Sequence, residues 1–180
     1  MRLFITFFIL FSLSSHAQFD QAIHCGYDFT SYLVLHVHED GKNENIPNLK
    51  ITLIDENGVE VVNNNNQYSW TNSGKVLKFY ENYQIDNKGN KVSLEEINDQ
   101  LKWYFPFAKA TYILSVTNEF PADNFMIKVE DTSENPIYKT TTKQLYTFNM
   151  YVLCSSDVEQ KSRQFGRRVN RPVSVILEKN

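Results

Sequence analysis

Apolar and polar residues alternate along much of the chain, and this period of two predicts β-strands because successive strand residues point to opposite faces of a sheet. The pattern predicts strands at Tyr27–His38, Lys50–Asp55, Thr111–Thr117, Phe125–Asp131, Leu145–Cys154 and Val173–Leu177. Both faces of the first strand are apolar in the middle, as expected of a central strand in a sandwich. We expect one core to contain Leu33, Leu35, Ile51, Leu53, Ile113 and Val116.

Turn-forming residues separate these segments. Glu56-Asn57-Gly58 predicts a hairpin with a type I′ turn, since Asn-Gly accepts positive φ angles, and Val59–Val62 would pair back. The four asparagines Asn63–Asn66 predict a solvated loop. Weaker strand signals follow at Gln67–Trp70 and Lys75–Tyr80, and Asp86–Asn90 predicts another turn.

A single helix is predicted between the strands, from Leu94 to Leu101. Ser93 and Glu96 have the spacing of a capping box, and Leu94, Ile97 and Leu101 would share one face. Short strands with Gly, Pro and Asn between them are typical of an all-β, antiparallel β-sandwich of the prealbumin or immunoglobulin type. The helix would lie in an insertion of that sandwich.

The N-terminal seventeen residues predict a signal peptide. A basic Arg2 precedes an apolar run of about 11 residues, which is too short to span a bilayer as a helix. Ser15 and Ala17 fit the positions that precede a cleavage site, so the exported chain would begin at Gln18. Residues 18–180 are then expected to form one domain, in the periplasm, at the cell surface or outside the cell.

Composition narrows the classes of partner. The formal net charge is −3, so the chain has no general attraction for nucleic acid or anionic membranes. No apolar run after the signal approaches the length of a transmembrane helix. The two cysteines, Cys25 and Cys154, predict a disulfide because export supplies an oxidising compartment. The alternative is a pair of buried free thiols.

Residues Leu33–Val61 carry a resemblance to a known family. A strand, an acidic-Gly turn, Ile46-Pro47, an alternating strand and an Asn-Gly hairpin follow one another. This order resembles the opening of carboxypeptidase regulatory-like, or prealbumin-like, β-sandwich domains, and Thr111–Val116 resembles one of their later strands. The resemblance implies a non-catalytic surface or accessory module without a particular ligand. The long segment Asn63–Phe107 departs from the family pattern.

Three groups of side chains could carry chemistry. His36 and His38 leave the same strand face at a spacing that suits zinc or copper, although a third ligand is needed. The alternative is a pair of structural histidines, so we assign no metal and no cofactor. Calcium could bind an acidic loop formed by Glu39, Asp40 and Glu44, or by Asp55 and Glu56. A basic patch near the C-terminus consists of Lys161, Arg163, Arg167, Arg168 and Arg171.

The patch could contact an anionic surface such as a polysaccharide or an acidic partner, or be a solvated loop. The sequence contains no familiar catalytic motif. We therefore expect a non-catalytic module that binds a protein or polysaccharide at the bacterial cell envelope or outside it. One alternative is a metal- or ligand-dependent enzyme using His36 and His38. Another is a subunit of a surface assembly that exposes Tyr68, Tyr80 and Tyr83.

Overall fold

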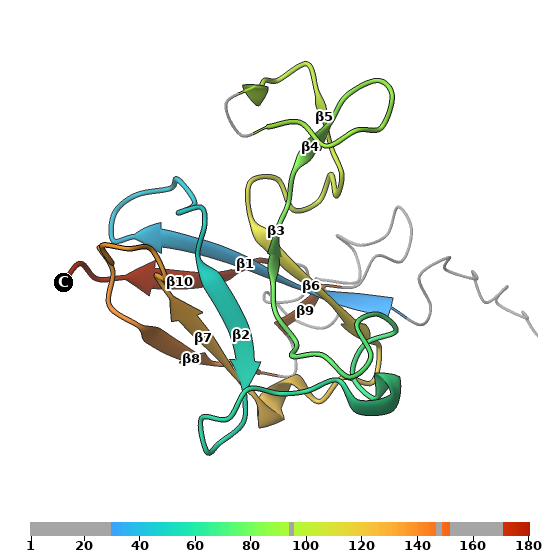
Figure 1. The fold of residues 1–180 in the computed structure, drawn as a ribbon, viewed down its shortest axis with the longest axis vertical. Helices are drawn as coiled ribbons and strands as arrows, with labels where there is room; N and C mark the ends of the chain where they lie inside the picture. The colour runs from blue at the N-terminus through green and yellow to red at the C-terminus, as the bar shows by residue number, and fades with distance from the viewer. Residues whose placement is uncertain (1–29, 94–95, 147–148, 152–170) are drawn as a thin grey trace, which may run out of the picture.

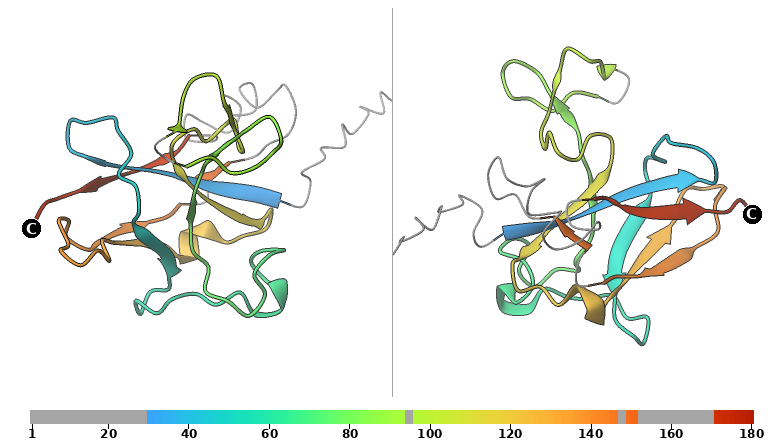
Figure 2. Two further views of the ribbon diagram at one scale, coloured as in Figure 1. Left: turned by 45° about the horizontal axis from the view of Figure 1, so that its top comes forward. Right: turned by 180° about the vertical axis from the view of Figure 1, so that it is seen from behind.

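The fold is an all-β sandwich of two facing sheets with a projecting arm (Figure 1). The computed structural model describes residues 30–93, 96–146, 149–151 and 171–180. Sheet A has the order β10-β1-β6-β3, with β9 also paired to β1, and sheet B has the order β2-β7-β8. The two sheets form separate layers when the molecule is turned (Figure 2).

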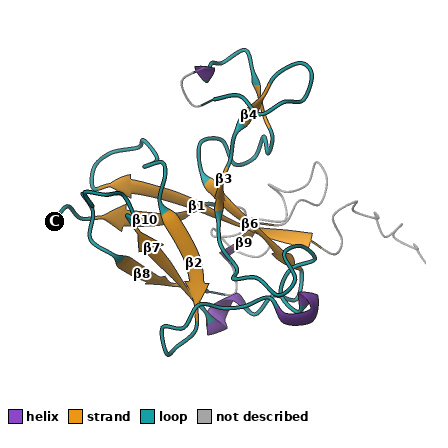
Figure 3. Cartoon of the chain, viewed as in Figure 1, coloured by secondary structure: helices purple, strands orange, loops and turns teal. Residues whose placement is uncertain are grey.

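Most strand bounds differ by a few residues from those predicted. The predicted strand Leu145–Cys154 is the exception, because its described residues, 145–146 and 149–151, form a strand only at Met150–Tyr151. The strand Thr141–Gln144 was not predicted. Sheet A contains β1 (Thr30–Glu39), β3 (Tyr80–Glu81), β6 (Tyr112–Thr117), β9 (Met150–Tyr151) and β10 (Val173–Leu177). Sheet B contains β2 (Lys50–Ile54), β7 (Met126–Glu130) and β8 (Thr141–Gln144). Two short 3-10 turns, η1 (Asn64–Asn66) and η3 (Ala122–Asn124), lie at one end of the sandwich (Figure 3). The segment Gln67–Trp70 forms no strand.

Among the strand pairs that the structure describes, the direction is antiparallel in all except one. β1 pairs with β6 in antiparallel register, with Leu33 opposite Leu114. On its other edge β1 runs parallel to β10, with Val37 opposite Val175. Alternation indicates which residues face the core but not the direction of a strand's neighbour, so the predicted all-antiparallel arrangement missed this pair.

The two sheets are joined along one side. Tyr138 and Lys179 form an isolated antiparallel bridge, and the Lys139 N–H donates to the Glu178 carbonyl at 2.9 Å. The Lys143 ammonium also donates to the Ser174 carbonyl at 2.6 Å. These contacts occupy polar groups along the outer edge of β10, which limits its ability to pair with another chain.

The main core lies between the two sheets. It contains Leu33, Leu35, Ile51, Leu53 and Val116, as predicted, together with Leu114 and Tyr112. Ile113 was placed in this core wrongly. It is three residues from Val116, so the period of two turns it to the opposite face of sheet A, where it packs with Tyr32, Val34 and Ala108 in an outer cluster.

The arm comprises residues 82–110 and projects from the end of β3 (Figure 1). Its ribbon is formed by β4 (Gln84–Ile85) and β5 (Lys102–Trp103), with Gln84 opposite Trp103. The predicted helix Leu94–Leu101 is not present in its described part, residues 96–101, which contain one 3-10 residue and turns. No helix in the described ranges is long and apolar enough to cross a membrane.

The helix fails for a local reason. The Gln84 side chain donates to the Asn98 carbonyl at 2.9 Å and accepts from the Asn98 N–H at 3.0 Å, which fixes this segment as a loop against the ribbon. The Ile97 side chain, expected on a buried face, is 37% exposed. A helix of eight residues gains little from propensity alone, so these tertiary contacts decide its conformation.

The Asn57-Gly58 turn differs from the predicted type I′ turn. Gly58 has a φ of +78°, but Asn57 is absent from the residues with positive φ. The Gly58 N–H donates to the Asp55 carbonyl at 3.0 Å and the Asp55 N–H donates to Val59 at 2.9 Å. This is the three-residue hairpin loop, in which a type I turn is followed by a left-handed glycine. The hairpin itself is confirmed.

Asn63 corrects the interpretation of the asparagine run as a solvated loop. Its side chain is fully buried and makes four hydrogen bonds to the following loop, at the carbonyls of Ser69 and Thr71 and the N–H groups of Tyr68 and Ser69. Asn64 and Asn65 are exposed, as expected. The run therefore begins with a structural residue and only then becomes a surface turn.

Candidate functional site

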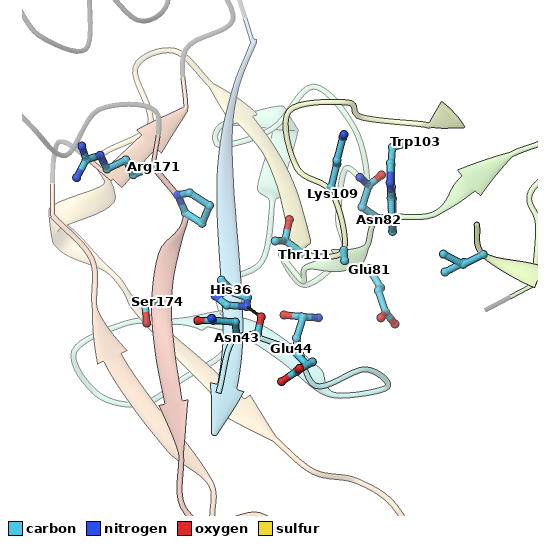
Figure 4. Close-up of a pocket in the computed structure, with 14 residues that line it drawn as sticks. His36, Asn43, Glu44, Glu81, Asn82, Trp103, Lys109, Thr111, Arg171 and Ser174 are labelled. Atoms are coloured by element: carbon cyan, nitrogen blue, oxygen red, sulfur yellow. Dashed lines mark hydrogen bonds between the residues drawn. The ribbon is translucent and has the colours of Figure 1, made fainter. Parts of the chain in front are cut away.

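A hollow of about 730 Å³ lies between the base of the arm and the outer face of sheet A (Figure 4). We call it the trough. It extends from Arg171, Pro172 and Ser174 of the β10 segment, across His36 of β1, to the arm. Its volume is within the range of about 300–1,000 Å³ typical of ligand sites. The lining on the arm side consists of Glu81, Asn82, Ile97, Trp103, Lys109, Ala110 and Thr111.

One wall of the trough is the loop after β1, which carries Asn43, Glu44 and Asn45. The Asn43 carbonyl contacts His36 Nε2 at 2.8 Å, and the Asn45 side chain accepts from the Val37 N–H at 2.9 Å. A residue of the main core also holds this loop, because the Tyr112 hydroxyl donates to the Ile46 carbonyl at 2.8 Å. This wall is therefore fixed before any ligand arrives.

The opposite wall is organised by Asn82. Its side chain is 3% exposed, donates to the carbonyls of Phe105 and Ala108 at 2.9 and 2.6 Å, and accepts from the Phe105 N–H at 3.2 Å. The Asn82 N–H also donates to Thr111 at 2.9 Å. These bonds close the turn that presents Lys109 to the trough.

Ala110, beside Lys109, has a φ of +46°. A residue with a Cβ in the left-handed region costs free energy and persists only where the surroundings impose it. Asn82 and Thr111 supply that constraint, since Thr111 also donates its hydroxyl to Ala108 at 2.9 Å. The strained residue lies on the trough surface.

The charged groups of the trough are available to a ligand. Within the described part of the chain, no hydrogen bond or ion pair occupies the side chains of Glu44, Lys109 or Arg171. Burial raises the pKa of Glu81 above its usual value, although the Asn48 N–H and the Lys91 ammonium oppose this effect. The trough thus presents two cations and two acidic groups along an open surface.

The structure places His36 and His38 side by side, with ring centroids 4.6 Å apart in a stacked pair. Among the residues that the structure describes, no three His, Cys, Asp or Glu side chains gather in a way that could hold a metal ion. His38 Nδ1 contacts the Glu39 carbonyl at 2.8 Å and Nε2 contacts the Ser174 hydroxyl at 2.7 Å. The carbonyl can only accept, so in the neutral imidazole Nδ1 carries the proton and Ser174 donates to Nε2.

The acidic loops have structural partners. Glu39 binds the ammonium groups of Lys42 and Lys179 and the Tyr138 hydroxyl, and these contacts lower its pKa to about 2. Asp55 accepts the N–H groups of Asn57 and Val59 inside its own turn. Of the five carboxylates proposed for calcium, Glu39 and Asp55 are therefore occupied by an ion-pair cluster and a turn, and in the described part of the chain the five do not gather into a group that could hold a metal ion.

The remaining predicted site residues are only partly described. Arg171 of the basic patch lines the trough, whereas Lys161, Arg163, Arg167 and Arg168 lie outside the described residues. Cys25 and Cys154 also lie outside them. Of the tyrosines expected on the surface, Tyr80 is 51% exposed, but Tyr68 packs against the core.

Sequence reasoning missed the arm side of the trough. Trp103 belongs to the aromatic run Trp103–Phe107, which was the available signal, although Trp103 is the residue of that run that lines the trough. No local sequence pattern marks Asn82 or Lys109 as a site residue. Asn82 bonds to Phe105 and Ala108, which lie 23 and 26 residues further along the chain, and these bonds position the turn that carries Lys109.

No family model matches the chain, and no curated protein or solved structure matches it.

Proposed function

We propose that this protein is an exported, non-catalytic β-sandwich module that binds a polysaccharide at the bacterial cell envelope or outside it. The trough carries the proposal, because unengaged charged groups and the Trp103 indole line one preformed hollow. Sites of this kind combine apolar surface for contact with a few polar groups for orientation. Nucleic acid is a poor candidate, since the net charge is −3.

The shape of the lining favours a polymer over a compact ligand. Arg171 and Lys109 come from different sides of the trough, with β1 between them (Figure 4). A sugar chain can lay the C–H face of one ring on Trp103 while its hydroxyl groups reach Glu44 and Asn43. A carboxylate accepts hydrogen bonds from sugar hydroxyl groups, and an amide side chain both accepts from them and donates to them.

Two features outside the trough support the same function. The predicted signal peptide, Met1–Ala17, would deliver the chain to the compartment that contains envelope polysaccharides. The resemblance of Leu33–Val61 to prealbumin-like modules favours an accessory binding role. The alternative partner is a surface protein with exposed acidic and basic groups. The following test distinguishes a polysaccharide partner from a protein partner.

The test is affinity electrophoresis of the exported chain in gels containing dextran, laminarin, xylan or alginate. We expect one of these to retard the protein, and Trp103→Ala and Lys109→Ala each to weaken that retardation by about tenfold, as for residues that contribute more than about 1 kcal/mol. Tyr146→Ala is the matched surface control, since Tyr146 is 54% exposed and does not line the trough. Equal mobility of all variants in every gel would contradict the proposal.

The Ser174–His38 pair favours a second candidate function, hydrolysis of an ester. In this reaction Ser174 Oγ would attack the acyl carbon, its proton would pass to His38 Nε2 and then to the leaving alcohol, and water would release the acid. The exported protein would then react with a fluorophosphonate probe, and both Ser174→Ala and His38→Ala would abolish the labelling. Absence of labelling would refute this candidate and leave the pair as a cross-strand hydrogen bond at 2.7 Å.

A further inference from the structure

The arm has two faces, and only one of them belongs to the trough. Tyr104 follows Trp103 on β5, and its N–H donates to the Tyr83 carbonyl at 2.8 Å, so the ladder continues one residue beyond Gln84 and Trp103. Because successive residues of a ribbon point to opposite sides, Trp103 faces one way and the pair Tyr83–Tyr104 faces the other.

A second hollow of about 300 Å³ lies on this other side. Tyr80, Tyr83 and Phe105 supply its aromatic surface, and Thr71, Asn72 and Ser115 supply polar groups. Glu81 and Asn82 line both hollows, so the base of the arm is the wall between them.

The aromatic side of the second hollow is rigid. Tyr83 stacks on Tyr104 with centroids 5.0 Å apart and an interplanar angle of 19°. Tyr104 meets the edge of Phe105 at 4.7 Å, and Phe105 packs on Tyr32 of β1 at 5.4 Å. The stack is thereby fixed to the sandwich, which lowers the entropic cost of using it as a binding surface.

One polar feature accompanies the stack. The Lys91 ammonium lies over the Tyr83 ring, 5.1 Å from its centre, so a cation accompanies the aromatic stack. The exposed fraction of Tyr80, which lines the second hollow, is 51%, and this leaves ring surface for a ligand. Flat aromatic surface with hydroxyl and amide groups opposite suits a pyranose ring, which has an apolar C–H face and a polar rim.

We infer that the second hollow binds a sugar residue of a second polysaccharide segment, so that the arm stands between two glycan sites and the module can bridge chains. This inference rests on the proposed function for the ligand class, but it concerns different residues. Tyr80 would stack on the sugar, Tyr83 would border it, and Thr71, Asn72 and Ser115 would receive its hydroxyl groups.

The test is the stoichiometry of binding, measured by titration calorimetry with hexasaccharides of the four polysaccharides named above. We expect the exported chain to bind two hexasaccharides, and Tyr80→Ala/Tyr83→Ala to bind one. Trp103→Ala should also bind one, because this substitution weakens the trough and leaves the second hollow. Tyr80→Phe/Tyr83→Phe is the matched control, because it keeps both rings and should retain at least about half of the wild-type affinity at both sites.

A second variant tests the hollow without removing the aromatic side chains, in case Tyr80→Ala/Tyr83→Ala unfolds the arm. Ser115→Leu adds bulk on the opposite wall without touching the stack, and it should also reduce the stoichiometry to one. Binding of one hexasaccharide by the wild type and by all Tyr and Ser variants would overturn the inference and leave the trough site intact. Loss of the only bound hexasaccharide in Tyr80→Ala/Tyr83→Ala but not in Trp103→Ala would support the second hollow and refute the trough. Absence of any binding would overturn both.

Discussion

Two buried asparagines, Asn63 and Asn82, determine the loops that surround the candidate sites. Each uses both its amide nitrogen and its oxygen, and each bonds only to backbone groups. Buried polar groups of this kind are costly unless every partner is present, so they hold a loop in one conformation. Their roles were invisible in the sequence, where one begins an asparagine run and the other lies between aromatic residues.

Replacing Asn63 with alanine tests this role. Asn63→Ala leaves the N–H groups of Tyr68 and Ser69 and two carbonyls without their partner. We expect the free energy of unfolding to fall by about 2–4 kcal/mol, measured by urea denaturation. Asn64→Ala, at an exposed neighbour, should change it by less than about 0.5 kcal/mol. Equal effects of the two substitutions would contradict the structural role of Asn63.

Asp131 gives the chain a dependence on acid pH. It accepts the Ser133 hydroxyl and the N–H groups of Ser133, Ile137 and Tyr138, and these bonds lower its pKa from 3.8 to about 2. A lowered folded-state pKa means that the contribution to stability is complete above the unfolded value and disappears as the pH falls toward 2. The melting temperature of the wild type should therefore fall between about pH 4.5 and pH 2.

Asp131→Asn removes this titration but keeps a side-chain oxygen. The variant should melt lower than the wild type at pH 7, and the gap should narrow as the pH approaches 2. Glu39, whose pKa is also lowered to about 2, contributes in the same direction and remains in the variant. A gap that stays constant from pH 7 to pH 2 would show that Asp131 does not carry the effect.

At the scale of the elements, the local sequence pattern predicts where strands and turns occur, but it does not predict which strands pair with one another. The alternation in Ile51 and Leu53 predicted β2, and the glycines marked the hairpin turns correctly. The helix at Leu94–Leu101 was wrong because its pattern is overridden by the contact between Gln84 and Asn98. Two turns, Asp55–Val59 and Asp86–Asn90, are built alike. Each begins with an aspartate whose carboxylate accepts hydrogen bonds from two of the N–H groups that follow it.

The glycine in these turns is required by backbone conformation alone. Gly58 has a φ of +78°, and a Cβ at this position would meet nothing within 4 Å. Gly58→Ala should therefore lower the free energy of unfolding by about 1–2 kcal/mol through strain without a steric clash. Gly58→Asn should recover a large part of the loss, since asparagine tolerates the left-handed region. Thermal denaturation of the three proteins measures the difference, and full stability of Gly58→Ala would refute the explanation.

At the scale of the whole molecule, a sandwich could be predicted but its sites could not. The core positions came from period-two alternation, which failed only where the parity was misjudged, at Ile113. The trough needs β10, β1 and the arm to meet, and no local pattern encodes that meeting. His36 and Arg171 were identified as candidates without any indication that they line the same hollow.

The disulfide between Cys25 and Cys154 stays a prediction at this scale. Both residues belong to the part of the chain beyond the described ranges. Reduction of the exported protein, or Cys154→Ser, should lower the free energy of unfolding by about 2–5 kcal/mol, seen as a lower melting temperature. Ala108→Ser, a small buried change that spares both cysteines, should leave the response to reductant unchanged. Two thiols titrating in the denatured, unreduced protein would refute the bond.

The parallel pairing of β1 with β10 has a consequence for biogenesis. Ser174 and His38 are 136 residues apart in the chain, and the central strand of sheet A lacks part of its edge until the C-terminal strand has been synthesised. Contacts between residues so distant in sequence slow folding, because the loop between them must close first. A ribosome-bound or newly released precursor would therefore stay unfolded for longer than a protein with local pairings. Such a delay would suit the export that the predicted signal peptide, Met1–Ala17, implies, because a chain passes through a translocation channel before it folds.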